Sequence, residues 1–154
     1  MNALKAFQFV SRFPAGRWLF SWAVCWSALY FASIRPQIKL LKPGRAEVTI
    51  KKRRRVENHL KTVHAIAMCN MAELAGGLCT DVSIPRGSRW IPVGMTVEYL
   101  KKAKTDLTAI ADGQHIDWCR EGEVVVPVEV RDTQAQLVFR AEIRMNLKSA
   151  QASA

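Results

Sequence analysis

VHAIAMCNMAELAGGLC, residues 63–79, decides the fold of this 154-residue chain. Small or apolar side chains fill almost every position of the stretch, and Asn70 and Glu73 are its only strongly polar interior members. A helix that is apolar on every side is a buried helix, whereas a surface helix has a single apolar stripe. The stretch therefore predicts one helix that is buried all round at the centre of the domain.

Strand-like segments flank this predicted helix. Upstream, the residues after Pro36 alternate between apolar and polar, and Lys42-Pro43-Gly44 marks a turn, which predicts a β-hairpin. Downstream, four segments rich in Val, Ile and Thr are expected to be strands: residues 90–101, 105–111, 124–131 and 136–147. The sequence pattern lacks the β-α-β alternation that is typical of a parallel sheet. The order of elements therefore predicts an α+β fold with an antiparallel β-sheet wrapped around one long buried helix.

Residues 1–34 are expected to form an N-terminal segment of two amphipathic helices with a turn at Pro14-Ala15-Gly16. Trp18, Trp22 and Trp26 recur at every fourth position, which places them on one helical face. Three alternatives remain open for this face: packing on the domain or a partner subunit, peripheral membrane contact, or a short span formed by uncharged residues 18–34. The main domain is expected to cover residues 35–148, followed by a disordered tail at 149–154.

The formal net charge of +10 favours phosphate-bearing partners. The basic run 51–55 lacks the interleaved aromatic residues that stack on bases, so nucleic acid is not the favoured partner. The four cysteines include no C-x-x-C pair and no zinc-ligand spacing. We therefore expect a cytoplasmic protein with no metal and no redox cofactor.

Glu73 and the helix start are the candidates for chemistry. A buried, unpaired carboxylate costs several kcal/mol, so Glu73 is expected to be paired or functional; a thin wet stripe or a structural ion pair is the alternative. A carboxylate in a partly apolar site can act as nucleophile or general base. Unpaired N–H groups at the helix start, near Thr62 to Ala65, can hold an oxyanion.

The spacing of Asn58, His64-Ala65-Ile66 and Glu73 resembles that of the hotdog-fold thioesterases of the phenylacetate-pathway type. Their pattern is Asn, a short loop, His-Gly-Gly, and an acidic residue well down the central helix. The resemblance implies a hotdog fold and an acyl-CoA thioesterase active across a subunit interface, in a homodimer or a dimer of dimers (a homotetramer). It further implies that Glu73 is the nucleophile or the base, that the Ala65 N–H polarises the thioester carbonyl, and that Asn58 orients water or substrate. His64 is expected to cap or position the helix start.

Two further expectations concern the substrate. Arg53, Arg55, Lys101 and Lys102 are candidates for binding the phosphates of coenzyme A, which would enter as part of the substrate. Ala65-Ile66 replaces the family's Gly-Gly and narrows the pocket. The alternative function is therefore a non-catalytic hotdog module that binds an acyl thioester or a protein partner.

Overall fold

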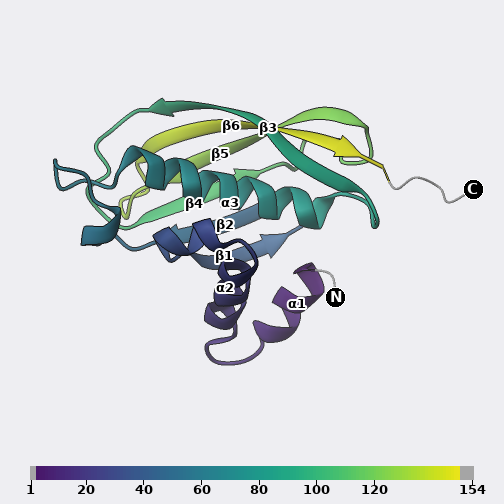
Figure 1. The fold of residues 1–154 in the computed structure, drawn as a ribbon, viewed down its shortest axis with the longest axis horizontal. Coiled ribbons are helices and arrows are strands. Elements are labelled where there is room, and N and C mark those ends of the chain that lie inside the picture. Colours follow the sequence, from purple (N-terminus) through teal and green to yellow (C-terminus); the bar gives the residue numbers. More distant parts are fainter. Residues whose placement is uncertain (1–2, 150–154) are drawn as a thin grey trace, which may run out of the picture.

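The computed structural model describes residues 3–149 and confirms the predicted α+β hotdog architecture (Figure 1). Its helices are α1 (Ala3–Val10), α2 (Gly16–Ser27), the 3-10 segments η1 (Leu29–Ile34) and η2 (Arg54–Val56), and α3 (Ala65–Ser83). Its strands are β1 (Gln37–Lys42), β2 (Arg45–Ile50), β3 (Arg89–Tyr99), β4 (Leu107–Asp112), β5 (Gly122–Arg131) and β6 (Leu137–Lys148). The strands form one antiparallel sheet in the order β1-β2-β4-β5-β6-β3.

The predicted hairpin is the pair β1 and β2, closed by Pro43 and Gly44. Gly44 has φ +75, the left-handed value that suits glycine at the third position of a type II turn preceded by proline. Its N–H donates to Ser83 Oγ at 2.8 Å, and its carbonyl accepts from Gly113 N–H at 2.8 Å. The turn is thereby tied to the end of α3 and to the loop after β4.

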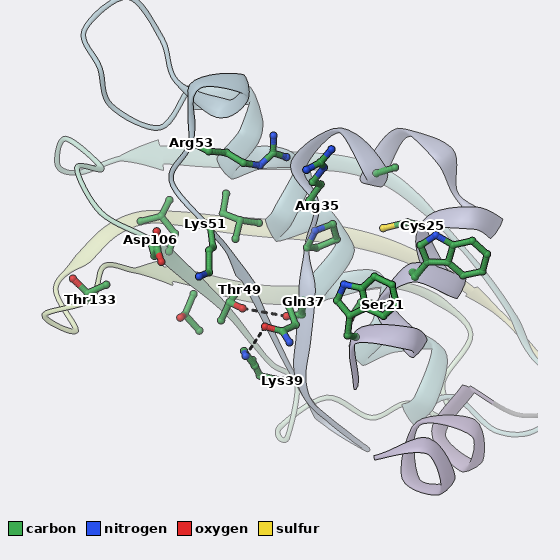
Figure 2. Close-up of a pocket in the computed structure, with 17 residues that line it drawn as sticks. Ser21, Cys25, Arg35, Gln37, Lys39, Thr49, Lys51, Arg53, Asp106 and Thr133 are labelled. Carbon is green, nitrogen blue, oxygen red and sulfur yellow. Dashed lines mark hydrogen bonds between the residues drawn. The ribbon is translucent and has the colours of Figure 1, made fainter. Parts of the chain in front are cut away.

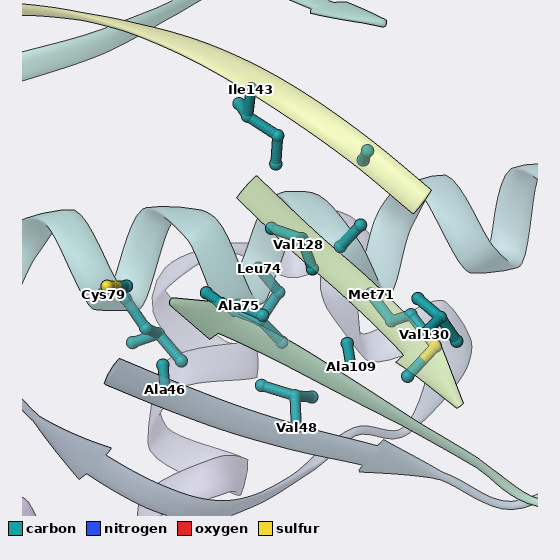
Figure 3. Packing of buried hydrophobic residues seen from close by; sticks show 14 of the residues in the cluster. Ala46, Val48, Met71, Leu74, Ala75, Cys79, Ala109, Val128, Val130 and Ile143 are labelled. Carbon is teal, nitrogen blue, oxygen red and sulfur yellow. The ribbon is translucent and has the colours of Figure 1, made fainter. Parts of the chain in front are cut away.

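The core lies between α3 and the inner face of the sheet (Figure 3). In β2, burial alternates strictly, so that Ala46, Val48 and Ile50 point to α3 while the intervening side chains face outward. Met71 and Ala75 of α3 are fully buried against this layer. Small residues on α3 let the sheet approach closely: a Cβ added at Gly76 would lie 2.9 Å from Ile143 Cδ1.

The expectation that the central helix is buried all round is wrong for the single chain. Ile66 and Glu73 are exposed and Cys69 is half-buried, which leaves one open stripe along α3. The small residues that suggested burial on every side are covered by the curved sheet on one side and by η1 on another. The stripe faces the side of the sheet that ends at β3.

β3 is an edge strand whose one partner among the described residues is β6, and it exposes a row of large apolar side chains to water. Its exposed members are Ile91, Val93, Met95 and Tyr99. Met95 and Tyr99 lie opposite the buried Ile143 and Phe139 of β6, and so they face the same side as α3. Pro92 sits here at a break in register, a position that edge strands accept because proline has no N–H to donate.

The two N-terminal helices pack below the hairpin edge of the sheet (Figure 1). Phe7 and Phe20 meet edge to face with ring centroids 5.2 Å apart, and both are buried. Ser21 Oγ accepts the Ile38 N–H at 2.9 Å, which fastens α2 to the outer edge of β1. Within residues 3–149, no helix combines the length and hydrophobicity needed to cross a bilayer. The predicted tail, apart from Ser149, lies outside the described residues.

Candidate functional site at the start of the central helix

The start of α3 presents an unpaired backbone donor. His64 is the N-cap, and its Nδ1 accepts the Ile66 N–H at 3.1 Å. The His64 carbonyl accepts from Ala67 and Met68 at 3.0 and 3.2 Å. Ala65 occupies the first helical position, and its N–H has no acceptor within residues 3–149. The N–H is therefore available to a carbonyl or an oxyanion, and the positive end of the helix dipole favours a negatively charged partner there.

Asn58 holds the loop that leads into α3. Its Oδ1 accepts the Leu60 and Thr62 N–H groups at 2.9 and 3.2 Å, and its Nδ2 donates to Thr62 Oγ1 at 3.0 Å. His64 N–H donates to the Val56 carbonyl at 2.7 Å, which anchors the same loop. The described contacts thus give Asn58 a positioning role for the helix start.

A small open cleft of about 240 Å³ lies beside this helix start. Its lining residues include Tyr30 and Ser33 of η1, Arg55 of η2, the N-cap His64, and Asn70 of α3. Asn70 is 5% exposed, and its Nδ2 donates to Ser33 Oγ at 3.2 Å. Its Oδ1 is buried and has no partner within residues 3–149. Nothing in the sequence pattern had assigned Asn70 to the site, although its amide stood out among small and apolar neighbours.

Glu73 lies two helical turns beyond the first turn of α3 on the open stripe, and in the single chain its side chain is exposed rather than buried. It makes no hydrogen bond or ion pair with residues 3–149. The other α3 carboxylate, Asp81, accepts from Trp90 Nε1 at 3.3 Å, so it is engaged with β3. Glu73 is therefore the carboxylate of α3 that remains available for chemistry.

Tyr99 of β3 forms the neighbouring contact on the same stripe. Its hydroxyl lies 3.3 Å from Cys69 Sγ, one helical turn before Glu73. The hydrogen bond to Cys69, together with burial, raises the pKa of Tyr99 to about 12. This contact ties the phenol hydroxyl of β3 to the central helix. Sequence reasoning missed Tyr99 because its proximity to α3 depends on the pairing of β3 with β6.

The structure does not gather the four candidate cations into one group. Arg55 lines the small cleft, and the loop with Lys101 and Lys102 adjoins the helix start through the Val63 N–H to Ala103 carbonyl bond of 2.8 Å. Lys101 Nζ itself donates to Gln136 Oε1 at 3.0 Å. Arg53 lines a different, larger cleft on the outer face of the sheet.

Solved structures similar to this chain carry the same fold. A structural-genomics target, APC5556, is 53% identical, with 96% of this chain and 98% of that chain covered and a TM-score of 0.86. Thioesterase HI1161 of Haemophilus influenzae is 16% identical, with coverage of 85% and 90% and a TM-score of 0.74. The Pseudomonas aeruginosa protein PA5026, a probable thioesterase, is 22% identical, with coverage of 79% and 87% and a TM-score of 0.70. Among curated proteins, no significant match is found.

The family comparison covers most of the chain. Residues 16–147 match the family described as Domain of unknown function (DUF4442), a span that begins with α2 and ends within β6. The structural neighbours that are called thioesterases align with most of this chain at TM-scores of 0.74 and 0.70, so they have the same fold. This chain is a member of the DUF4442 family, with the hotdog fold of the thioesterases.

Proposed function

We propose that this chain is an acyl-CoA thioesterase whose active site forms between two subunits, with Glu73 of one subunit and the start of α3 of the other. The observation that supports it most directly is the unpaired Glu73 carboxylate on the open stripe of α3, next to strand β3, whose outer edge has no partner strand within residues 3–149. Within residues 3–149, no side chain pairs with the Glu73 carboxylate and no strand pairs with the outer edge of β3. A site completed by a partner accounts for both features.

A homodimer with antiparallel pairing of two β3 strands would complete this site. Such pairing would continue the sheet, satisfy the free edge of β3 and cover Met95 and Tyr99. It would also set the two α3 helices side by side in opposite directions, which brings each Glu73 toward the other helix start. A single subunit cannot bring its own Glu73 to its own helix start, because Glu73 lies about 13 Å along the helix axis from His64.

The reaction is hydrolysis of the thioester. Glu73 takes a proton from water as the water oxygen bonds to the carbonyl carbon, and the Ala65 N–H stabilises the oxyanion that forms. The C–S bond then breaks, the thiolate of coenzyme A leaves, and it receives the proton held by Glu73. The products are a carboxylic acid and free coenzyme A. Arg55 and the loop with Lys101 and Lys102 flank the site on the side where the coenzyme phosphates would lie.

Thiol release from a panel of acyl-CoA esters tests the activity. Glu73→Gln removes the base while keeping the shape, and turnover is expected to fall by about 100-fold or more. The matched control is Glu142→Gln, because Glu142 is an exposed carboxylate on the outer face of β6. Full turnover by the Glu73 variant would contradict the mechanism.

Subunit complementation tests the shared site. Ala65→Pro removes the one N–H assigned to the oxyanion, and His64 at φ −65 and ψ 141 already has the extended conformation that proline requires before it. Each variant alone is expected to be inactive. Mixed subunits of Ala65→Pro and Glu73→Gln should regain about a quarter of the wild-type rate, because half of the dimers then hold one intact site. No recovery in mixed dimers would show that both groups act from the same chain.

A specific observation favours a second function, non-catalytic binding of an acyl thioester. Ile66, where the related thioesterases have glycine, is 54% exposed beside the Ala65 N–H. Its β-branched side chain occupies space that a substrate backbone would need. Calorimetry that shows binding of acyl-CoA without thiol release would establish this alternative, and Ile66→Gly would then be expected to produce turnover.

A further inference from the structure

A larger cleft, separate from the candidate active site, opens between α2 and the outer face of the sheet (Figure 2). Its volume is about 780 Å³. We call it the indole–cation cleft and define it by Trp18, Trp22, Arg35, Lys39, Lys51 and Arg53. Thr49 and Thr108 form part of its floor, on the sheet face turned away from α3.

One wall of the cleft is aromatic although α2 is already docked. Phe20 and Ser21 bury the inner face of the helix, whereas Trp18 and Trp22 on the outer face are 61% and 53% exposed. Trp26 extends this row, 71% exposed and stacked on Trp22 at a centroid distance of 5.5 Å. Leu29 and Tyr30 follow in η1, both more than two-thirds exposed. Exposed aromatic surface of this extent is typical of a binding surface.

The opposite wall has an excess of positive charge, with four cations and one carboxylate in the lining. Within residues 3–149, none of the four cations forms an ion pair, and Lys39 and Arg53 bond only to neutral oxygens of Gln37 and Ser33. The lining carboxylate, Asp106, accepts the Lys52 backbone N–H. Burial, and the positive charges of Arg35 and Arg55, lower the pKa of Arg53. Such a group of like charges is stabilised by a bound anion.

Aromatic and cationic side chains together favour one occupant over the others. A second copy of this chain seated symmetrically on the cleft would bring the same four cations against each other. An anionic bilayer meets both walls: tryptophan rings settle at the level of the lipid headgroups, and lysine and arginine attract the phosphates. A helix with its apolar face outward lies in the plane of such an interface.

We propose that this face docks on the surface of an anionic phospholipid bilayer, with Trp18, Trp22 and Trp26 in the headgroup layer and a lipid phosphate in the indole–cation cleft. The docking is peripheral and independent of the Glu73 chemistry. It would place the protein at the membrane with the edge strand β3 at the far end of the sheet, because β1 and β3 are the two outermost strands.

Co-sedimentation with vesicles tests the docking. The wild-type chain is expected to bind vesicles of phosphatidylglycerol and phosphatidylcholine in equal amounts, with a blue shift of tryptophan emission, and not to bind phosphatidylcholine alone. Arg35→Gln with Lys51→Gln should weaken binding on the order of 20-fold, because each cation near an anionic surface adds a several-fold gain. Arg140→Gln with Arg144→Gln is the matched control, since it removes the same charge from exposed positions on β6 and should lower binding less.

Substitution of the indoles separates lipid insertion from simple charge attraction. Trp18→Ser with Trp22→Ser should abolish both the co-sedimentation with vesicles and the blue shift of tryptophan emission, without changing the oligomeric state. The proposal would be overturned if the β6 control pair lost as much vesicle binding as Arg35→Gln with Lys51→Gln. It would also be overturned if the wild type did not bind vesicles and the tryptophan variant dissociated into smaller oligomers. Binding of free coenzyme A in the cleft, with no binding of vesicles, would likewise overturn it. Thiol release is measured separately, so failure of docking leaves the Glu73 mechanism testable.

Discussion

Ser21→Ala should weaken the attachment of α2 to the sheet. The decrease in the free energy of unfolding can be estimated from one buried backbone donor, the Ile38 N–H. Ser21 is 3% exposed, and its Oγ accepts from Ile38 N–H at 2.9 Å while donating to the Arg17 carbonyl at 2.7 Å. Ile38 is fully buried on the edge strand β1. Alanine at position 21 leaves the Ile38 N–H without an acceptor, and an orphaned buried donor costs about 1–3 kcal/mol.

The better helix propensity of alanine offsets about 0.5 kcal/mol of this loss. The net decrease in the free energy of unfolding is therefore expected to be about 0.5–2.5 kcal/mol, which corresponds to about 1–10 °C in Tm for a chain of this size. Urea unfolding measures the first quantity, and hydrogen exchange at the Ile38 amide should accelerate in parallel. The control is Ser27→Ala, because Ser27 is exposed and bonds only to the Ala23 carbonyl at 3.2 Å. Equal stability of the two variants would refute the assigned role of Ser21.

Three further predictions concern the core, the helix cap and pH. Met71→Ala should lower the free energy of unfolding by about 2–5 kcal/mol, because Met71 is fully buried, whereas Met71→Leu should cost less than about 1.5 kcal/mol in the same urea titration. His64→Ala should cost about 1 kcal/mol through loss of the Ile66 N–H acceptor, and His64→Asn should restore it, with circular dichroism as the measurement. Burial raises the pKa of the Cys79 thiol from 9.0 to about 11, so the folded state holds this proton more tightly. Stability should be complete below pH 9 and fall as the pH approaches 11; Cys79→Ala should flatten that part of the urea-midpoint profile, and an unchanged slope would contradict the assignment.

Local patterns were sufficient to predict the two N-terminal helices, the hairpin, the central helix and the four later strands in their order, but not the 3-10 segments η1 and η2. Proline and glycine at 43 and 44 determine the hairpin turn, and alternation along 45–50 shows which side chains meet the core. The strand order could not be predicted in this way, because the pairing of β3 with β6 joins residues that are 40 (Tyr99 and Phe139) to 59 (Arg89 and Lys148) positions apart and depends on the curvature of the whole sheet. The edge position of β3, and with it the exposure of Met95 and Tyr99, followed only from that pairing.

The candidate site was only partly accessible from the sequence. The cap at His64 and the free Ala65 N–H follow from helix-start rules, and the structure bears out the cap. The burial of Glu73 was wrongly expected in the single chain, because alanine and glycine at so many α3 positions erase the periodicity that would mark an open stripe. The indole–cation cleft is lined by side chains from α2, the start of β1 and the end of β2. Local sequence patterns cannot predict that these segments lie close together.

Exposure of Glu73 and exposure of the β3 edge are best understood as one property. Water alone can solvate an exposed carboxylate, and a single exposed methionine is common on protein surfaces. An unpaired row of backbone groups is different, because a long, uncovered edge strand is a template for pairing with another chain. β3 is eleven residues long and presents Ile91, Val93 and Met95 beside that edge. If a second β3 pairs there, as proposed, the same contact that protects the edge removes water from Glu73, so assembly and activation of the carboxylate would be a single event. Substituting Met95 by lysine should then abolish dimer formation and thiol release together, and an active monomer would separate the two.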